Sequence, residues 1–207
     1  MLFKVIDIAS GGGRRLSMRC PGCRQLGTFE PITNIPDLFV RPGNWFVQRV
    51  CPNTACLAHV FAVHNNSGTV LVSYPPQIID FDTKNIPAPI IKTFNEALTC
   101  HANGLHVATA LMIRRTLEEL CDNKGAKGTN LKDRISALQS VVVLPKELFI
   151  ALDDMRLLGN DAAHLEAKTY DSVGESEISV AIELTKEVLK AVYQLDDLVA
   201  RLRALKK

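Results

Sequence analysis

The sequence lacks an export signal and lacks any apolar segment long enough to span a bilayer. The first ten residues contain Lys4 and Asp7 and run into Gly11-Gly12-Gly13, so they form no signal-peptide core. Every later apolar stretch is interrupted by charges, prolines or glycines well before about 20 residues. We therefore expect a soluble, cytoplasmic protein with no membrane partner.

The chain also lacks a strong charge excess and the glycine motifs of common catalytic folds. The net charge is +2, and residues 1–80 hold seven Lys/Arg against four Asp/Glu. This surplus is too small to argue by itself for a nucleic-acid partner. The glycines at 11–13 lack the Lys and Ser/Thr of a phosphate-binding loop, and the sequence has no hydrolase elbow.

Four of the six cysteines occur as two close pairs, which predict a metal site. Cys20 and Cys23 flank a Pro-Gly turn, and Cys51 and Cys56 follow after 27 intervening residues. In a reducing compartment such pairs indicate metal binding rather than disulfides. Four thiolates close a tetrahedron around Zn²⁺, so we expect a structural zinc site that resembles a zinc ribbon over residues 18–74.

The cysteines and nearby histidines also allow other interpretations. The second pair has four intervening residues where two is commoner, so His59 or His64 is an alternative to Cys56 as the fourth ligand. Both histidines lie in an expected strand, where an imidazole is more often a polar surface group. A redox Cys-x-x-Cys motif is less consistent, because no βαβ pattern follows the first pair. Cys100 and Cys121 fall on expected helices and are interpreted as small core residues.

The pattern along the chain predicts an α+β protein, mainly α, with two domains. Strands are expected at 45–50, 57–64 and 69–74, with a hairpin turn at 65–68, as a small antiparallel sheet. Prolines between 75 and 89 indicate a linker, which gives a zinc-ribbon domain at 1–82 and a helical domain at 83–207. Helices are expected at 88–102, 105–122, 131–140, 145–164 and 175–205.

The periodic apolar residues of the last expected helix predict a buried stripe and hence a helical bundle. They recur at spacings of three, four and seven: Ile178, Ile182, Leu189, Val192, Val199 and Leu202.

The N-terminal half also combines arginines with aromatic residues. This mixture is compatible with phosphate contacts and base stacking, and also with a solvated face over a small aromatic core, which the small charge excess favours. The residues concerned are Arg14, Arg15, Arg19, Arg24, Arg41, Arg49, Phe29, Phe39, Trp45 and Phe46.

A polar stripe is expected near the end of the fourth helix. Arg156, Asn160 and His164 are spaced i, i+4 and i+8, so on one continuous helix they drift only about 80° around the axis. A cation, an amide and an imidazole on one face suit a phosphodiester substrate. The alternative is architectural, with Gly159 or Asn160 ending the helix and His164 near its negative end.

The segment from Ala88 to His164 resembles a bacterial domain-of-unknown-function family related to the HEPN superfamily, whose name stands for higher eukaryotes and prokaryotes nucleotide-binding. The resemblance rests on Ile113-Arg114-Arg115-Thr116-Leu117-Glu118 and on Leu158-Gly159-Asn160-Asp161-Ala162-Ala163-His164, and it extends over roughly residues 88–200.

The resemblance implies a helical bundle that pairs as a homodimer and occurs in toxin, restriction and antiviral systems, where active members cut RNA without a metal. Their motif is an arginine, commonly followed by asparagine, with four to six residues between the arginine and a histidine. Asn160 and His164 match this motif, whereas Gly159 stands at the arginine position and Arg156 lies about one turn earlier. Arg114 and Arg115 are adjacent, so at most one of them faces the bundle interior.

Two functions follow from these observations. The first, which the resemblance implies, is an HEPN-like endoribonuclease or nucleic-acid-binding effector, with RNA or DNA as its partner and with Arg156, Asn160 and His164 as the catalytic residues of the endoribonuclease. The second is a non-enzymatic dimerisation or interaction module of a restriction or regulatory system, docking to a larger protein. The departure at Gly159 favours the second, and the shared polar face favours the first.

Overall fold

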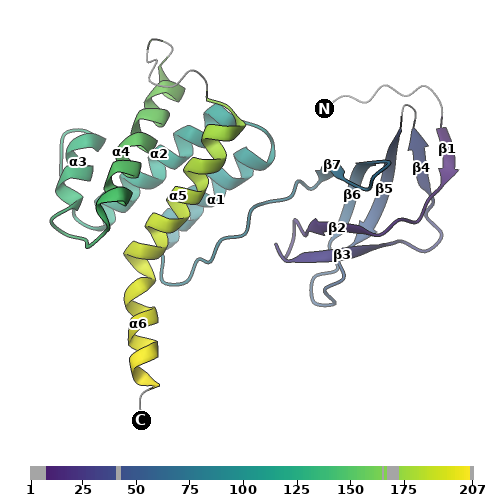
Figure 1. Cartoon of the computed structure of the whole chain (residues 1–207), viewed down its shortest axis with the longest axis horizontal. Coiled ribbons are helices and arrows are strands. Elements are labelled where there is room, and N and C mark those ends of the chain that lie inside the picture. Colours follow the sequence, from purple (N-terminus) through teal and green to yellow (C-terminus); the bar gives the residue numbers. More distant parts are fainter. Residues whose placement is uncertain (1–7, 41–42, 165, 167–172, 206–207) are drawn as a thin grey trace. The chain divides into compact units, whose positions relative to one another are not determined.

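The computed structural model describes residues 8–40, 43–164, 166 and 173–205. Two compact units follow one another along the chain, one ending at Asp80 and the other beginning at Phe81. The first is an antiparallel sheet and the second is helical, which confirms the expected α+β, mainly α, fold class (Figure 1). No helix within the described ranges has the length and apolar character needed to cross a membrane.

The N-terminal unit is a seven-stranded antiparallel sheet, larger than the three strands expected. The strands are β1 (Ile8–Gly11), β2 (Leu16–Arg19), β3 (Leu26–Pro31), β4 (Asp37–Val40), β5 (Asn44–Val50), β6 (His59–Asn65) and β7 (Val70–Tyr74). The path runs β1-β4-β5-β3-β2, with β6 beside β5 and β7 beside β6. The longest pairing joins β5 to β6, with Trp45 opposite His64 and Val50 opposite His59.

The expected hairpin turn joins β6 to β7. Asn65 Oδ1 accepts hydrogen bonds from the Thr69 backbone amide and from Ser67 Oγ, and Gly68 takes a positive φ of 90°. This conformation favours glycine, which explains the Asn-Asn-Ser-Gly sequence.

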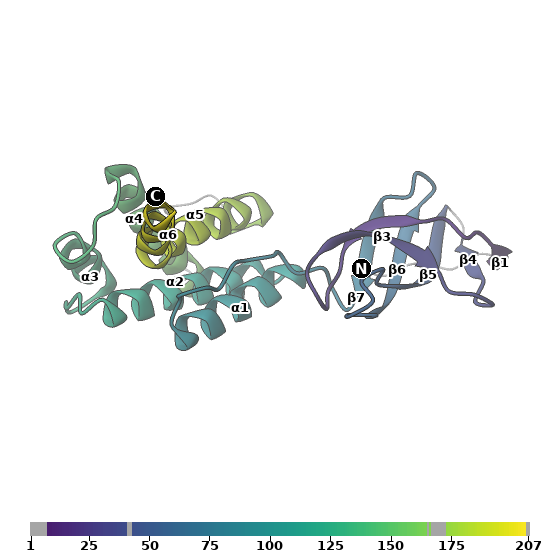
Figure 2. The same cartoon turned by 90° about the horizontal axis from the view of Figure 1, so that it is seen from below.

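The C-terminal unit has six helices in its described part rather than five. They are α1 (Ala88–Ala102), α2 (His106–Asn123), α3 (Leu131–Leu138), α4 (Lys146–Ala163), α5 (Glu175–Tyr193) and α6 (Leu195–Ala204). Helix α2 packs against α1, α3, α4 and α5, so it is the centre of the helical core (Figure 2). The Asn130 side chain caps α3 by accepting a hydrogen bond from the backbone amide of Asp133 at 3.0 Å.

The prediction of a single last helix over 175–205 is wrong. Helix α5 ends at Tyr193 and α6 begins at Leu195, with Gln194 between them. The Gln194 side chain is buried and donates from Nε2 to the carbonyl oxygens of Asp82 and Lys84 at 2.9 and 3.0 Å. These long-range bonds anchor the break between α5 and α6.

The expected burial of the apolar stripe holds for only part of it. On α5, Ile178, Ile182 and Leu189 are fully buried and Val192 is half-buried. On α6, Val199 and Leu202 are 38% and 67% exposed, and no residue of this helix is buried. Helix α6 extends beyond the rest of the bundle (Figure 1).

Candidate functional site

The ends of four strands bring the paired cysteines together in the N-terminal unit. Cys20 follows β2 and Cys23 precedes β3, while Cys51 follows β5 and Cys56 precedes β6. Their sulfur atoms all lie within 4.8 Å of one another. Cys20 and Cys51 are buried and pack in a small core with Met18, Phe29 and Val60. The cluster therefore lies within the sheet unit rather than on a loop apart from it.

The sulfur separations have the values that a tetrahedral metal ion requires. Cys20 Sγ lies 3.7 Å from Cys56 Sγ, and Cys23 Sγ lies 3.8 Å from Cys51 Sγ. With metal–sulfur bonds of about 2.3 Å, the edge of a regular tetrahedron is about 3.8 Å. A disulfide needs about 2.05 Å, and all four cysteines are free thiols. The four cysteines are thus arranged so that they can hold one metal ion.

The turn between Cys20 and Cys23 supports the cluster through its backbone. The amide of Gly22 donates to Cys20 Sγ at 3.3 Å, the kind of contact that stabilises a thiolate. A Cβ atom on Gly22 would lie 3.0 Å from Ala58 Cβ and 3.1 Å from Cys56 Sγ. A side chain at this position would therefore fit only if Ala58 or Cys56 moved by a few tenths of an ångström.

The protonation of the thiols is shaped by burial and by backbone amides. Burial raises the pKa of Cys51 to about 12 and also raises the pKa of Cys20. A backbone hydrogen bond from Gln25 lowers the pKa of Cys23 to about 7. Cys23 is therefore the first of these three thiols to ionise, and a cation is needed to hold the buried ones as thiolates.

The two histidines considered as alternatives to Cys56 belong to other environments. His59 is exposed and stacks on Phe61, whereas His64 is buried, lies in a stacked contact with Trp45, and contacts the carbonyl oxygen of Asn65 through Nδ1 at 2.7 Å. The expectation of a surface histidine is therefore wrong for His64. Cys100 is half-buried and Cys121 is buried, with its pKa raised to about 11 by burial.

The arginines and aromatic residues of the sheet unit that the structure describes lie in several different environments. Phe29 belongs to the core, and Arg49 is fully buried. Arg15 pairs with Glu30, Arg14 donates to the carbonyl oxygen of Asn66, and Arg19 donates to that of Arg24. Phe39 lies against Trp45, and Arg41 falls outside the described residues.

Arg49 is an architectural residue. Its guanidinium makes two hydrogen bonds of 2.7 Å to the Asp37 carboxylate and also donates to the carbonyl oxygen of Arg14. Burial alone would raise the pKa of Asp37, but hydrogen bonds from Arg49 and the Gly13 amide outweigh it and lower that pKa. The phosphate-contact role considered for Arg49 is therefore wrong, because its charge is buried and paired.

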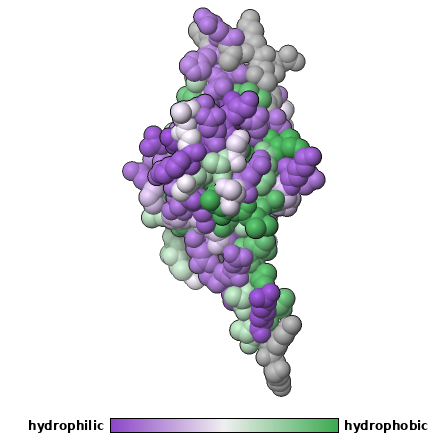
Figure 3. Space-filling view, turned by 90° about the vertical axis from the view of Figure 1, so that its left-hand side faces the viewer, coloured by the Kyte–Doolittle hydropathy of each residue, from purple (hydrophilic) through white to green (hydrophobic). Residues whose placement is uncertain are grey.

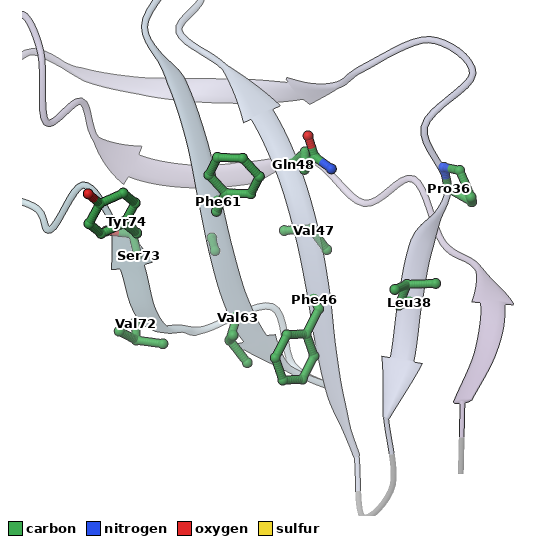
Figure 4. Close-up of a pocket in the computed structure, with 11 residues that line it drawn as sticks. Pro36, Leu38, Phe46, Val47, Gln48, Phe61, Val63, Val72, Ser73 and Tyr74 are labelled. Carbon is green, nitrogen blue, oxygen red and sulfur yellow. The ribbon is translucent and has the colours of Figure 1, made fainter. Parts of the chain in front are cut away.

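A shallow apolar depression of about 240 Å³ lies on the sheet (Figure 4). It includes Phe46, Phe61 and Tyr74, whose rings rise from neighbouring strands. Its described lining includes no charged residue. An aromatic surface is thus present, but without the cations that nucleic-acid binding by stacking usually combines with it.

The three residues of the expected polar stripe, Arg156, Asn160 and His164, lie in three different environments. Arg156 is only 12% exposed and pairs through Nε with Asp153 at 2.7 Å. Asn160 accepts a hydrogen bond from Arg114, and its carbonyl oxygen accepts the backbone amide of His164 at 3.0 Å. His164 is exposed and has extended backbone angles at the end of α4, so it does not continue the helix. Neither Gly159 nor Asn160 ends the helix.

Arg114 is the residue of this cluster to which the sequence assigned no definite place. Its Nη1 donates to Asn160 Oδ1 at 2.6 Å, while its Nε pairs with Glu118 at 3.3 Å. A Cβ on Gly159 would lie 2.7 Å from Arg114 Cβ. Arg115 points elsewhere and pairs with Glu119. The guanidinium next to Asn160 therefore comes from α2, and Gly159 provides the space for it.

Comparison with known proteins gives one family and no individual relative. No curated protein and no solved structure matches the chain. A family model described as "Domain of unknown function (DUF4145)" matches residues 95–205. This match begins within α1, ends at the last described residue of the helical unit and covers more than half of the chain. The chain therefore belongs to the DUF4145 family.

Proposed function

We propose that this protein is a non-enzymatic interaction module that pairs with a second copy of itself through α6, and that a structural Zn²⁺ holds its N-terminal sheet together. The proposal for the metal is supported by the sulfur separations of 3.7 and 3.8 Å. Four thiolates fill a tetrahedral shell and leave no position for a substrate. The ion therefore acts by stabilising a small sheet.

The observation that supports pairing is the apolar side of α6. Leu195, Leu198, Leu202 and Leu205 are between 51% and 79% exposed and recur at spacings of three and four. Together with Val199 they cover about 120° of the helix circumference at about 100° per residue. Figure 3 shows hydrophobic surface continuing down toward the lower end of the helical unit.

A helix of this length needs a partner for that side. Helix α6 has ten residues, none of them buried, and isolated helices below about 12 residues are marginal in water. Its exposed leucines are also a contiguous apolar surface of the kind that marks interaction sites.

The charges of α6 favour a second copy as the occupant. Asp196 and Asp197 lie in the first turn, and Arg201 and Arg203 lie in the last. Asp197 pairs with Lys84 and Arg201 of its own chain, but in an antiparallel pair of α6 helices Asp196 would face Arg203 of the partner copy. A two-fold interface is self-complementary in this way, and one helix supplies both halves of the charge pattern.

The test is the molecular mass of the full chain in solution. Light scattering at micromolar concentration should give twice the 22.8 kDa chain mass for the wild type, and close to one chain mass for Leu198→Glu. Ala200→Glu, on the opposite side of α6, is the matched control and should remain a dimer. A wild-type monomer would contradict the proposal, and so would a Leu198→Glu variant that is still a dimer. A monomer that binds a larger protein would show that the apolar side of α6 binds that protein instead of a second copy.

A second candidate function is binding and cleavage of RNA at the end of α4. It is favoured by the contact of Arg114 with Asn160, which brings a guanidinium next to the glycine that stands at the motif's arginine position. The exposed His164 imidazole is available for proton transfer. Against it, both Arg114 and Arg156 are already paired with carboxylates, so neither offers an uncompensated charge to a phosphate.

A further inference from the structure

Two histidines and a glutamate meet at one end of the helical unit. His101 lies in the last turn of α1, His106 is the first residue of α2, and Glu175 is the first residue of α5. One ligand atom from each lies within 4.8 Å of those of the other two. None of these residues takes part in the cysteine cluster or the polar stripe of α4.

The local sequence explains why the two imidazoles lie together. The turn between α1 and α2 closes through Gly104, whose φ is +71° and whose amide donates to the carbonyl oxygen of His101 at 2.8 Å. The amide of Leu105 donates to the carbonyl oxygen of Cys100 at 3.0 Å. A glycine in this conformation ends α1 sharply and starts α2 next to it. The spacing His-x₄-His therefore places both rings at the same end of the helix pair.

Glu175 is held toward these rings by the start of α5. The neighbouring acidic residue, Glu177, is occupied as a cap and accepts the amide of Gly174 at 3.0 Å. Glu175 instead accepts a hydrogen bond from Ser179 Oγ at 3.2 Å, an outer contact that orients its carboxylate.

The distances fit metal ligands better than they fit a direct ion pair. His101 Nε2 lies 3.7 Å from Glu175 Oε1, and His106 Nδ1 lies 3.6 Å from Glu175 Oε2. A charged N–H···O bond would be about 2.7–2.9 Å. Two ligands at about 2.0–2.1 Å from a tetrahedral ion are about 3.4 Å apart, which is nearer to the observed values.

The ring nitrogens of the two histidines also favour a metal site. Within the described residues, His101 Nδ1 and His106 Nδ1 are buried and have no hydrogen-bond partner. A buried polar atom without a partner is energetically unfavourable, which is a cost to the folded protein. A cation between His106 and Glu175 would remove that cost for His106 and would balance the carboxylate charge.

We propose that His101, His106 and Glu175 form a second metal site, which takes a first-row divalent transition-metal ion such as Zn²⁺. Imidazole nitrogen selects such ions over Ca²⁺ and Mg²⁺, which prefer oxygen ligands. Three protein ligands leave a coordination position open, and Glu175 is 64% exposed, so that position faces water. This site differs in kind from the closed cysteine cluster, because a small anionic or carbonyl ligand can reach its metal.

The experiment counts metal ions per full-length chain. Protein is equilibrated against micromolar Zn²⁺ and the bound metal is measured. The wild type should hold two ions per chain, and His106→Ala should hold one. His164→Ala, an exposed histidine in the same unit, is the matched control and should hold two.

Glu175→Gln keeps the proposal testable if His106→Ala loses helical structure, because this exposed side chain is changed conservatively. Its second ion should bind more than about tenfold more weakly than in the wild type, with an unchanged helical circular-dichroism signal.

Co²⁺ used as a probe then identifies the ligands. The first equivalent should show thiolate-to-metal charge transfer, and the second should add only weak ligand-field bands, which His106→Ala should remove. One ion per wild-type chain would overturn the proposal, and so would a second ion that persists at full affinity in both His106→Ala and Glu175→Gln.

Discussion

Arg114 on α2 donates a hydrogen bond of 2.6 Å to Asn160 on α4, and the two helices approach so closely there that Gly159 has no room for a side chain. This contact joins the two motifs on which the HEPN resemblance rests. It also explains the glycine physically, since a Cβ would lie 2.7 Å from Arg114 Cβ.

Gly159→Ala should therefore destabilise the helical unit. The clash forces α2 and α4 apart at a cost of about 1–3 kcal/mol, of which the better helix propensity of alanine recovers at most about 1 kcal/mol. Urea unfolding followed by helical circular dichroism measures the difference. Gly11→Ala is the control, because a Cβ there meets nothing within 4 Å. Equal stability of wild type and Gly159→Ala would show that α2 and α4 can separate freely.

The buried pair of Arg49 and Asp37 gives a second prediction, for the sheet unit. Arg49→Met should cost about 3–5 kcal/mol, because it leaves the Asp37 carboxylate buried without its partner. Arg49→Met/Asp37→Leu should recover much of that loss. Arg15→Met is the matched control and should change the free energy of unfolding little, since the Arg15–Glu30 pair is largely exposed. A small effect of Arg49→Met alone would contradict the buried-charge interpretation.

The same pair predicts a pH dependence. The pKa of Asp37 is lowered in the folded protein, so its contribution to stability is fully present above the unfolded value of about 3.9 and is lost as pH falls through the folded pKa. The stability advantage of the wild type over Arg49→Met/Asp37→Asn should therefore shrink on acidification below about pH 4. An advantage that grows in acid would have the wrong sign.

Removal of the metal from the cysteine cluster should unfold the sheet unit before the helical one. The four cysteines connect β2, β3, β5 and β6, and metal-binding free energy in such sites is folding free energy. Because burial raises the pKa of Cys51 to about 12, binding must release protons and should weaken as pH falls. Cys23→Ser should lose the cluster's metal, whereas Cys100→Ser should retain it. Full occupancy in Cys23→Ser would show that the ligand assignment is wrong.

The cysteine cluster could be predicted from sequence because each pair is local and its chemistry is distinctive. The strands before residue 44 could not, since they are short and are interrupted by glycine and arginine. The break at Gln194 has no local signal either, because the bonds that anchor it go to Asp82 and Lys84. The sequence also could not predict the contact between Arg114 and Asn160, or the proximity of His101 and His106 to Glu175. Each depends on how distant helices pack.

His164 separates the two candidate functions most directly. It is exposed at the end of α4, and its backbone amide, which any residue would retain, makes the bond to Asn160. His164→Ala should therefore leave the melting temperature nearly unchanged. Arg156→Ala should lower it, because Arg156 is largely buried and paired with Asp153. For an interaction module, the zinc-loaded wild type should cleave no RNA, and His164→Ala should dimerise normally. Cleavage of RNA by the wild type without added metal, reduced about 100-fold or more in His164→Ala at unchanged stability, would establish the second candidate and contradict the non-enzymatic proposal.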